Sequence, residues 1–207
     1  MLGPPGVGKG TQAKILVEAL QIKHIASGEL FRRNQTCGTD LGIKAQAYIG
    51  SGNLVPDEIT IGMVLEEVLS ESSKDGFVLD GFPRNMVQVQ SLHQALQFME
   101  TDIDSAILLT VPREELLKRL TGRRLCPKCQ ANYHLTSTPP GRSGLCDYCD
   151  SVLYQREDDM PVAVNTRLEV YYSETEPIIN YYASSGCLKQ IDGVGTVSEI
   201  ENRISHS

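Results

Sequence analysis

Three features are missing from this chain of 207 residues, and each absence narrows the class of protein. No apolar run approaches the ~18 residues of a membrane-spanning helix, which argues against a membrane span. Positive charge is not in excess: the formal net charge is −7, whereas a broad nucleic-acid surface needs a basic face. No signal peptide is expected, because only Met1 and Leu2 precede the first motif. We therefore expect a cytoplasmic globular enzyme with neither a nucleic acid nor a membrane as its partner.

A glycine-rich stretch near the start, Gly3–Thr11, fits the phosphate-binding loop pattern of Gly, four residues, then Gly-Lys. Its glycines let successive backbone N–H groups point into one concavity, and Lys9 adds a compact positive charge for the outer phosphates. A helix predicted over 8–20 would direct its positive end at the same anion. Gly10 stands where Ser or Thr usually follows the lysine, and the hydroxyl comes one position later. An ordinary glycine-rich turn is the alternative, which the order of these residues disfavours.

Short apolar runs alternate with amphipathic stretches along the rest of the chain. This alternation predicts an α/β fold with a central parallel sheet and helices on both faces. Functional groups then lie beyond the carboxyl ends of the strands, where the phosphate loop, Asp80 and Arg84 fall. Strands are expected at 24–26, 77–79, 106–111 and 189–192; helices at 8–20, at two segments between 27 and 51 that break near 37–38, and at 56–69, 88–98, 112–120, 161–182 and 197–204.

The strand that should lead into the phosphate loop is nearly missing. A phosphate loop normally follows a buried parallel strand, yet only Met1 and Leu2 precede this one. Each absent buried Val, Leu or Ile would cost ~1.5–3 kcal/mol. We therefore expect about four to six apolar residues before Met1 in the full protein.

Four of the six cysteines form two Cys-x-x-Cys pairs, Cys126-Pro-Lys-Cys129 and Cys146-Asp-Tyr-Cys149, separated by sixteen residues. This spacing fits a four-thiolate zinc site, and four protein ligands make such a site structural. A redox pair, which needs only two cysteines, and two disulfides are the alternatives. A zinc ribbon that reads nucleic acid is a further one, which the surrounding acidic residues disfavour. Cys37 and Cys187 are expected to be free thiols.

Arginines are the other candidates for phosphate binding, because phosphoryl transfer requires charge neutralisation on both donor and acceptor. Each also has a structural interpretation. Arg119 follows Glu115 by four residues on a predicted helix, which suits an exposed ion pair. Arg156 could pair with Asp158 or Asp159. Other candidates could be solvated, and sequence spacing does not say whether they converge. The candidates are Arg32, Arg84, Arg119, Arg123, Arg156 and Arg167.

Several motifs occur together in one order: the phosphate loop, Ser27–Arg32, Asp80-Gly81-Phe82-Pro83-Arg84, Gly122–Arg124 and Arg156–Asp159. With them, the chain resembles the adenylate kinases, in particular the long-lid bacterial type whose lid carries zinc. Asp-Gly-Phe-Pro-Arg is highly specific for nucleoside monophosphate kinases, whereas the phosphate loop is not. The resemblance covers essentially the whole chain. It implies a P-loop nucleotide kinase that catalyses MgATP + AMP ⇌ 2 ADP as a monomer, with structural zinc in the lid and Mg²⁺ on ATP.

The resemblance also implies roles for individual residues, by positioning and charge neutralisation without a protein general base. The amide of Gln88 suits an adenine edge, since it offers a donor and an acceptor. Ser27 stands where many members have Thr and keeps the hydroxyl. The implied catalytic residues are Lys9, Asp80, Arg84, Arg123, Arg156 and Arg167. The implied ATP site comprises Gly3, Gly6, Val7, Gly8, Lys9, Gly10, Thr11, Arg119, Arg123, Asn132, Tyr133 and Gly195. The implied AMP site comprises Ser27, Arg32, Asn53, Leu54, Val55, Gly81, Phe82, Pro83, Arg84, Gln88, Arg156 and Arg167. Zinc would be bound by Cys126, Cys129, Cys146 and Cys149.

Three parts follow from the same resemblance: a core (1–25, 56–121 and 160–207), a helical AMP-binding insert (26–55) and a zinc-ribbon-like lid (122–159). Adenylate kinase lids are a known example of closure that excludes water from the reaction. We expect zinc to keep the lid rigid while hinges near Gly122 and Asp159 move.

Other functions remain open. A kinase for UMP, CMP or GMP is the first alternative, although Gln88 favours adenine. A nucleotide-dependent switch is less expected, because Arg32 and Arg84 form a second phosphate-side group that a switch does not need.

Overall fold

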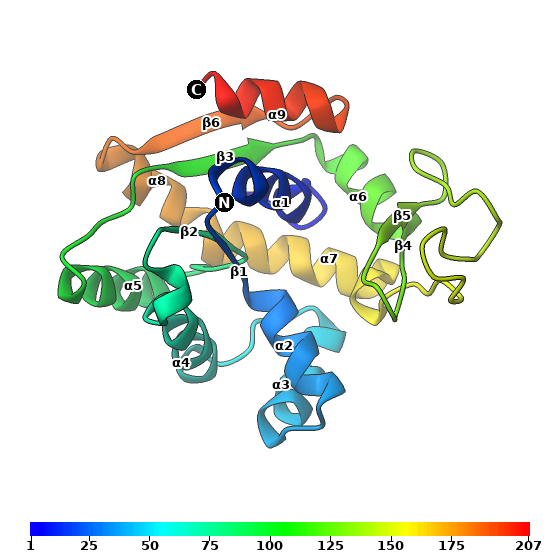
Figure 1. Ribbon diagram of the computed structural model, residues 1–207, viewed down its shortest axis with the longest axis horizontal. Helices are drawn as coiled ribbons and strands as arrows, with labels where there is room; N and C mark the ends of the chain where they lie inside the picture. The colour runs from blue at the N-terminus through cyan, green and yellow to red at the C-terminus, as the bar shows by residue number, and fades with distance from the viewer.

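The core of the computed structural model, which describes residues 1–207, is built on short parallel strands (Figure 1). Strand β1 (Lys23–Ala26) pairs in parallel with β2 (Phe77–Asp80), and β3 (Ala106–Thr110) pairs in parallel with β6 (Leu188–Asp192). All four lie within one or two residues of their predicted positions. The predicted parallel arrangement is confirmed.

Met1 and Leu2 connect the two pairs of strands. The backbone N–H of Leu2 donates to the Ile107 carbonyl at 2.7 Å, and Leu2 forms a parallel bridge with Leu108. On the other side, the amino group of Met1 donates to the Leu79 carbonyl at 2.8 Å. The order across the sheet is therefore β1, β2, Met1–Leu2, β3, β6, and the phosphate loop leaves from its centre.

The helices follow the predicted segments with one difference, in the region 161–182. The single helix expected there is wrong: α7 and α8 are separated by a π-helical turn, η3 (Tyr171–Thr175). Pro177 has no N–H to donate within the helix, and the N–H of Glu176 reaches back five residues to Tyr171 at 2.9 Å. The helices are α1 (Lys9–Leu20), α2 (Ser27–Thr36), α3 (Asp40–Ser51), α4 (Asp57–Val68), α5 (Met86–Phe98), α6 (Arg113–Gly122), α7 (Pro161–Val170), α8 (Pro177–Ser184) and α9 (Val197–Ser205), with short 3₁₀ turns η1 (Glu71–Ser73) and η2 (Glu157–Asp159).

Helices cover both faces of the sheet. Successive side chains of β3 point to opposite faces, and each set packs against different helices. Ala106 and Leu108 join an apolar cluster with residues of α5 and α8. Ile107 and Leu109 pack into a different cluster, which includes residues of α6, α7 and α9. Helix α1 contacts β1, β2 and α9. Both faces of β3 are buried, which is why this strand is largely apolar in sequence.

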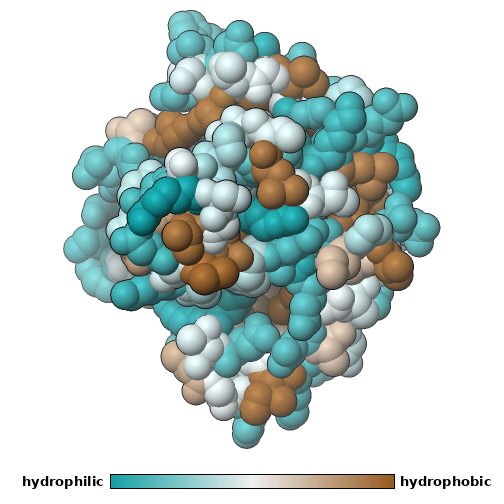
Figure 2. Space-filling model, turned by 90° about the vertical axis from the view of Figure 1, so that its right-hand side faces the viewer, coloured by the Kyte–Doolittle hydropathy of each residue, from teal (hydrophilic) through white to brown (hydrophobic).

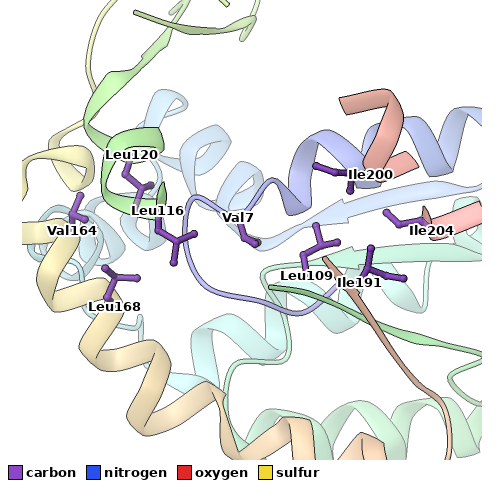
Figure 3. Packing of buried hydrophobic residues seen from close by; sticks show 9 residues of the cluster. All are labelled: Val7, Leu109, Leu116, Leu120, Val164, Leu168, Ile191, Ile200 and Ile204. Carbon is purple, nitrogen blue, oxygen red and sulfur yellow. The ribbon is translucent and has the colours of Figure 1, made fainter. Parts of the chain in front are cut away.

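The phosphate loop is anchored in one of these clusters (Figure 3). The side chain of Val7, in the middle of the loop, is fully buried. Leu116 and Leu120 of α6 lie on one side of it, and Leu109 of β3 lies on the other. Apolar packing thus holds the loop between the sheet and α6.

The region 122–159 forms a separate small unit beside α6 and α7 (Figure 1). Strands β4 (Arg123–Leu125) and β5 (Asn132–His134) pair antiparallel, and Leu125 also bridges to Tyr154. The face on this side of the molecule is largely hydrophilic, with small separate apolar areas (Figure 2). No helix of the structure is long and apolar enough to cross a membrane.

Candidate active site

The phosphate loop requires its glycines for backbone conformation and for space. Gly3, Gly6 and Gly8 have φ values of 132°, 83° and 106°, a region that side chains disfavour. A Cβ on Gly3 would also lie 2.5 Å from the Leu109 carbonyl oxygen, and a Cβ on Gly6 would lie 2.7 Å from the Leu120 side chain. No side chain caps the start of α1. The N–H groups of Lys9 and Gly10 are therefore available to an anion, whereas that of Thr11 donates to the Gly8 carbonyl at 3.1 Å.

Lys9 lies inside the curve of this loop. Its ammonium donates to the carbonyls of Gly3 at 2.7 Å and Pro4 at 3.0 Å. Burial lowers the pKa of Lys9 to about 8, against the raising effect of Asp80; nearby arginines, Arg84 among them, lower it further. The ammonium has only neutral carbonyl groups as hydrogen-bond partners, and a polyphosphate would supply a negatively charged one.

Asp80 explains the unusual glycine after the lysine. It ends β2, and a Cβ on Gly10 would lie 2.9 Å from its Oδ2. A serine or threonine at this position would meet the carboxylate. The hydroxyl therefore comes at Thr11, and Asp80 stays next to the start of α1. On its other side, Asp80 Oδ2 lies 3.9 Å from Nε2 of His24.

Two clefts meet at Arg84 and Arg167. The first, of about 540 Å³, is lined by Lys9 and Gly3 of the phosphate loop. The second, of about 600 Å³, is lined by residues of α2 and of the loop after α3, including Arg32. Both arginines line both clefts. The structure thus places two predicted phosphate ligands in the wall between the phosphate loop and the predicted insert.

Two arginines of the lid and Arg167 of α7 converge on two adjacent carboxylates. Asp159 accepts from Arg123 Nε at 2.7 Å and Nη2 at 2.5 Å, and from Arg167 at 3.1 Å. Asp158 accepts two hydrogen bonds from Arg156 and lies 2.9 Å from Arg167. The predicted Arg156–Asp158 pair is confirmed. The alternative that Arg167 is a solvated helix residue is wrong, because only 18% of its side chain is exposed.

This cluster is buried, and its charges depend on one another. Burial lowers the pKa of Arg167 to about 10, although Asp158 opposes the shift. Burial lowers the pKa of Arg84 as well. Burial also works against the charge on Arg156, but Asp158 and Asp159 outweigh it and raise the pKa of this guanidinium. Burial alone would raise the pKa of Asp158; Arg167 and Arg156 reverse this and lower it. The site is an array of desolvated cations with too few carboxylates.

The second cleft contains the residues expected to bind a monophosphate. Ser27 donates its hydroxyl to the Gly81 carbonyl at 2.7 Å. Burial lowers the pKa of Arg32, and Arg156 nearby lowers it further. Gln88 is buried at the base of the cleft, where its amide contacts Asp57, a residue that sequence reasoning missed. An acidic residue in the first turn of a helix usually signals only the helix dipole, so nothing in the sequence distinguished Asp57. The second cleft is also lined by Asn53, Leu54, Val55 and Arg156, whereas Leu54, Gly81 and Pro83 line the first.

Other predicted ATP ligands lie further from the two clefts. Arg119 forms its predicted ion pair with Glu115 at 3.0 Å and also donates to the carbonyls of Val7 and Gly193. Its guanidinium therefore lies at the edge of the phosphate loop, next to Gly193. Tyr133 is buried inside the lid, where its hydroxyl accepts from the Asp147 N–H at 2.8 Å. A nucleotide contact from this residue would have to come from its backbone. Asn132 beside it is exposed.

The four lid cysteines lie together, with all Sγ atoms within 4.8 Å of one another. The sulfurs of Cys126 and Cys149 are 3.3 Å apart, those of Cys129 and Cys146 3.4 Å, and those of Cys149 and Cys129 3.7 Å. These separations exclude disulfides, whose sulfurs are ~2.05 Å apart. Tetrahedral Zn–S bonds of ~2.3 Å place sulfurs roughly 3.8 Å apart. The donor set and its spacing fit zinc. All six cysteines are free, as expected for Cys37 and Cys187.

Comparison with known proteins identifies this arrangement. The sequence model of the family described as "Adenylate kinase" matches residues 1–187. The chain belongs to the adenylate kinase family. It is 46% identical over 206 residues to the adenylate kinase of Clostridium botulinum (strain Hall), which covers 100% of this chain and 95% of the relative. It is 46% identical over 204 residues to the adenylate kinase of Staphylococcus epidermidis (strain RP62A), covering 99% of this chain and 95% of the relative.

The match to the family model extends over most of the site described above, but not over Gly193 and Gly195. The matched residues include the phosphate loop, the residues of both clefts, the lid cysteines and the arginine–carboxylate cluster. A third relative, the adenylate kinase of Clostridium beijerinckii, is 46% identical over 200 residues, with 97% of this chain and 93% of the relative covered. The family predicted from the order of the motifs is therefore confirmed.

Proposed function

We propose that this adenylate kinase family member transfers the terminal phosphoryl group of MgATP to AMP, giving two ADP, within the site formed by the two clefts. The observation that carries the proposal is the position of Arg84 and Arg167, which line both clefts at once. A phosphoryl group that moves between two nucleotides passes through such a boundary. Charge stabilisation is needed there in every stage of the transfer.

The donor ATP would be held by the phosphate loop. The N–H groups of the first turn of α1 and the ammonium of Lys9 would bind the outer phosphates. Binding would exchange the two carbonyl contacts of Lys9 for phosphate oxygens. Arg119, at the edge of the loop, would border the adenine together with Gly195 and the lid residues 132–133.

Mg²⁺ bound with ATP would neutralise charge on the phosphates, and an oxygen donor is present to orient it. Asp80 offers a carboxylate beside Gly10 at the start of α1, and carboxylate oxygens are ligands that Mg²⁺ favours. The protein needs no general base for this reaction. Its residues position the two nucleotides and neutralise their charge.

The acceptor AMP would occupy the second cleft. Ser27, the backbone of 53–55 and Gln88 surround this space, and Arg32, Arg84 and Arg156 supply positive charge for its phosphate. Asp158 and Asp159 now balance Arg123, Arg156 and Arg167. A bound phosphate would share these arginines, because each guanidinium has five donors and the carboxylates use only some of them.

The three parts expected from the resemblance, the core, the insert 26–55 and the lid 122–159, would move relative to one another during catalysis. Structural zinc, bound by the four cysteines, would hold the lid as a rigid body. The monomeric state and the cytoplasmic location expected from the sequence stay predictions, and sedimentation analysis and cell fractionation would test them.

A stoichiometric assay tests the proposed reaction. ATP and AMP are mixed with the protein, and all three nucleotides are followed by phosphorus NMR. We expect one ATP and one AMP to disappear for every two ADP formed, with little ATP hydrolysis when AMP is omitted. Lys9→Met should abolish the conversion. ATP hydrolysis that is equally fast without an acceptor would contradict the proposal and favour a nucleotide-dependent switch.

A further inference from the structure

The orientation of the Gln88 amide is fixed by two contacts. Its Oε1 accepts the backbone N–H of Arg84 at 2.8 Å, and its Nε2 donates to Asp57 Oδ1 at 2.7 Å. A carboxylate can only accept, and a backbone N–H can only donate. Rotation of the amide by 180° would therefore bring donor to donor at Arg84 and acceptor to acceptor at Asp57. Both contacts disfavour the flipped amide.

Asp57 is itself held by a second partner. Asn85 Nδ2 donates to both carboxylate oxygens of Asp57, at 2.9 and 3.0 Å. The Oδ1 of Asn85 accepts the backbone N–H of Gln88 at 2.9 Å and caps α5. Asp57 in the first turn of α4 is thus tied to the first turn of α5. Gln88 lines the second cleft and Asp57 does not, so any effect of Asp57 on a ligand acts through Gln88.

The fixed amide keeps one donor and one acceptor for a ligand. An amide has two N–H donors and two lone pairs on oxygen, and each of the two contacts uses one of them. Adenine presents an amino donor at position 6 beside an acceptor at N1. A 6-oxopurine presents an acceptor at position 6 beside an N1–H donor. A freely rotating amide could match either edge by flipping, whereas an amide with one orientation matches only one.

We propose that Asp57 is a positioning residue that sets base selectivity, by preventing the Gln88 amide from flipping to match a 6-oxopurine. The proposal rests on the proposed function, because it assigns the second cleft to the acceptor nucleotide. Asp57 acts together with the Arg84 N–H, and of these two contacts only the carboxylate can be changed by a side-chain substitution.

Asp57→Asn tests this role, because an asparagine can donate as well as accept and leaves the amide less constrained. The readout is kcat/KM for AMP divided by kcat/KM for inosine monophosphate (IMP), measured at saturating ATP. IMP has the 6-oxo group and the N1–H but lacks the 2-amino group of GMP, so it isolates the edge that Gln88 would read. We expect the ratio to fall about tenfold, as for the loss of one charge-assisted hydrogen bond, with kcat/KM for IMP itself rising. The KM for ATP should not change.

Glu58→Gln is the matched control. Glu58 is the next residue in the first turn of α4 and is exposed. Its replacement by glutamine removes the same charge from the helix N-terminus as Asp57→Asn does. It should leave the AMP/IMP ratio unchanged. A second measurement places Asp57→Asn in a Gln88→Leu background, where no amide remains to flip. There the added substitution should not alter the ratio, even if Asp57→Asn also weakens packing.

Two outcomes would overturn the proposal. One is an equal loss of kcat/KM for AMP and IMP in Asp57→Asn, which indicates only a structural role. The other is a change of the ratio by Asp57→Asn in the Gln88→Leu background. If the wild-type protein phosphorylates AMP, either of these results from the variants leaves the proposed function intact. A wild-type protein that phosphorylates neither AMP nor another monophosphate would instead contradict the proposed function.

Discussion

The guanidinium of Arg123 and the carboxylate of Asp159 join the two ends of the lid through a pair of hydrogen bonds, Nε–Oδ2 at 2.7 Å and Nη2–Oδ1 at 2.5 Å. Arg123 begins β4, where the chain enters the lid, and Asp159 ends η2, where it returns to the core. The Asp159 side chain is fully buried. The same carboxylate also binds Arg167 of α7, so one acidic residue connects the lid with the core helix that follows it.

Asp159→Asn should therefore destabilise the protein strongly. Removing one partner of a buried ion pair typically costs about 3–5 kcal/mol, because the remaining charge is left uncompensated. Urea unfolding monitored by circular dichroism would measure the loss. Glu157→Gln, an exposed acidic neighbour in the same turn, should change stability by less than about 0.5 kcal/mol. Equal effects of the two substitutions would contradict a specific role for the buried carboxylate.

Gly122→Ala should displace the lid from α6. An alanine Cβ at this position would lie 2.2 Å from Nε2 of His134. The ring cannot easily move, since Nε2 lies 3.1 Å from the Lys118 carbonyl and Nδ1 accepts the backbone N–H of Thr136 at 3.2 Å. We expect a loss of about 1–3 kcal/mol in stability, as for other overpacked sites, together with reduced activity.

His134→Ala provides the control for this prediction. It removes the ring that Gly122→Ala would meet, so the double variant should lose less stability than the sum of the two single variants. A coupling energy of more than about 0.5 kcal/mol in a double-mutant cycle is expected for residues in contact. Additive effects would show that the ring does not limit residue 122.

Lys9 should make ATP use depend on pH in the alkaline range. Its pKa is lowered to about 8, chiefly by burial, and only the protonated ammonium attracts phosphate. The charge is present below this pKa and is lost as pH rises through it. We expect kcat/KM for ATP to be level below about pH 7.5 and to fall toward tenfold per pH unit above about pH 8.5. In Lys9→Arg the guanidinium stays charged, so kcat/KM for ATP should not fall in this pH range, whatever the absolute activity of the variant. A wild-type profile that stays flat to about pH 9.5 would be inconsistent with a buried, perturbed lysine.

Removal of the zinc proposed for the lid should affect stability more than catalysis. The four sulfurs fit a tetrahedral site, while the lid has only a small apolar cluster around Cys126, Tyr133 and Cys146. A strong chelator, or Cys146→Ser, should lower the Tm markedly but leave much of the activity at a mild temperature. Cys37→Ser, which changes an exposed free cysteine outside the lid, is the matched control. A loss of activity in parallel with the Tm would mean that zinc does more than hold the lid together.

The parts of the fold that were predictable from sequence are those coded locally. Strands β2 and β3 stand out because they are short, mostly apolar runs. The phosphate loop stands out because its glycines have conformations that other residues avoid. The π-helical turn at Tyr171–Thr175 was not predictable from periodicity, because apolar spacing continues through it. The proline at 177 was its only signal, and a proline in this place also permits a new helix to begin.

Many residues that line the two clefts could be named from the sequence, but their arrangement could not. The convergence of Arg84 and Arg167 on one boundary joins segments that are far apart in the chain, and sequence spacing carries no such information. Asp57 was missed for a different reason: an acidic residue in the first turn of a helix is common, and only its distance to Gln88 distinguishes it. The position of Tyr133 was also not predictable, because its aromatic ring packs inside the lid with the cysteines.

The most direct test of the proposed function is a coupled assay of ADP formation from ATP with AMP, GMP, CMP or UMP as the acceptor, each over a range of concentrations. AMP is predicted to give the highest kcat/KM, because Gln88 is held in one orientation in the second cleft, which Arg32 and Arg84 also line. A higher kcat/KM for any of the other three monophosphates would contradict it.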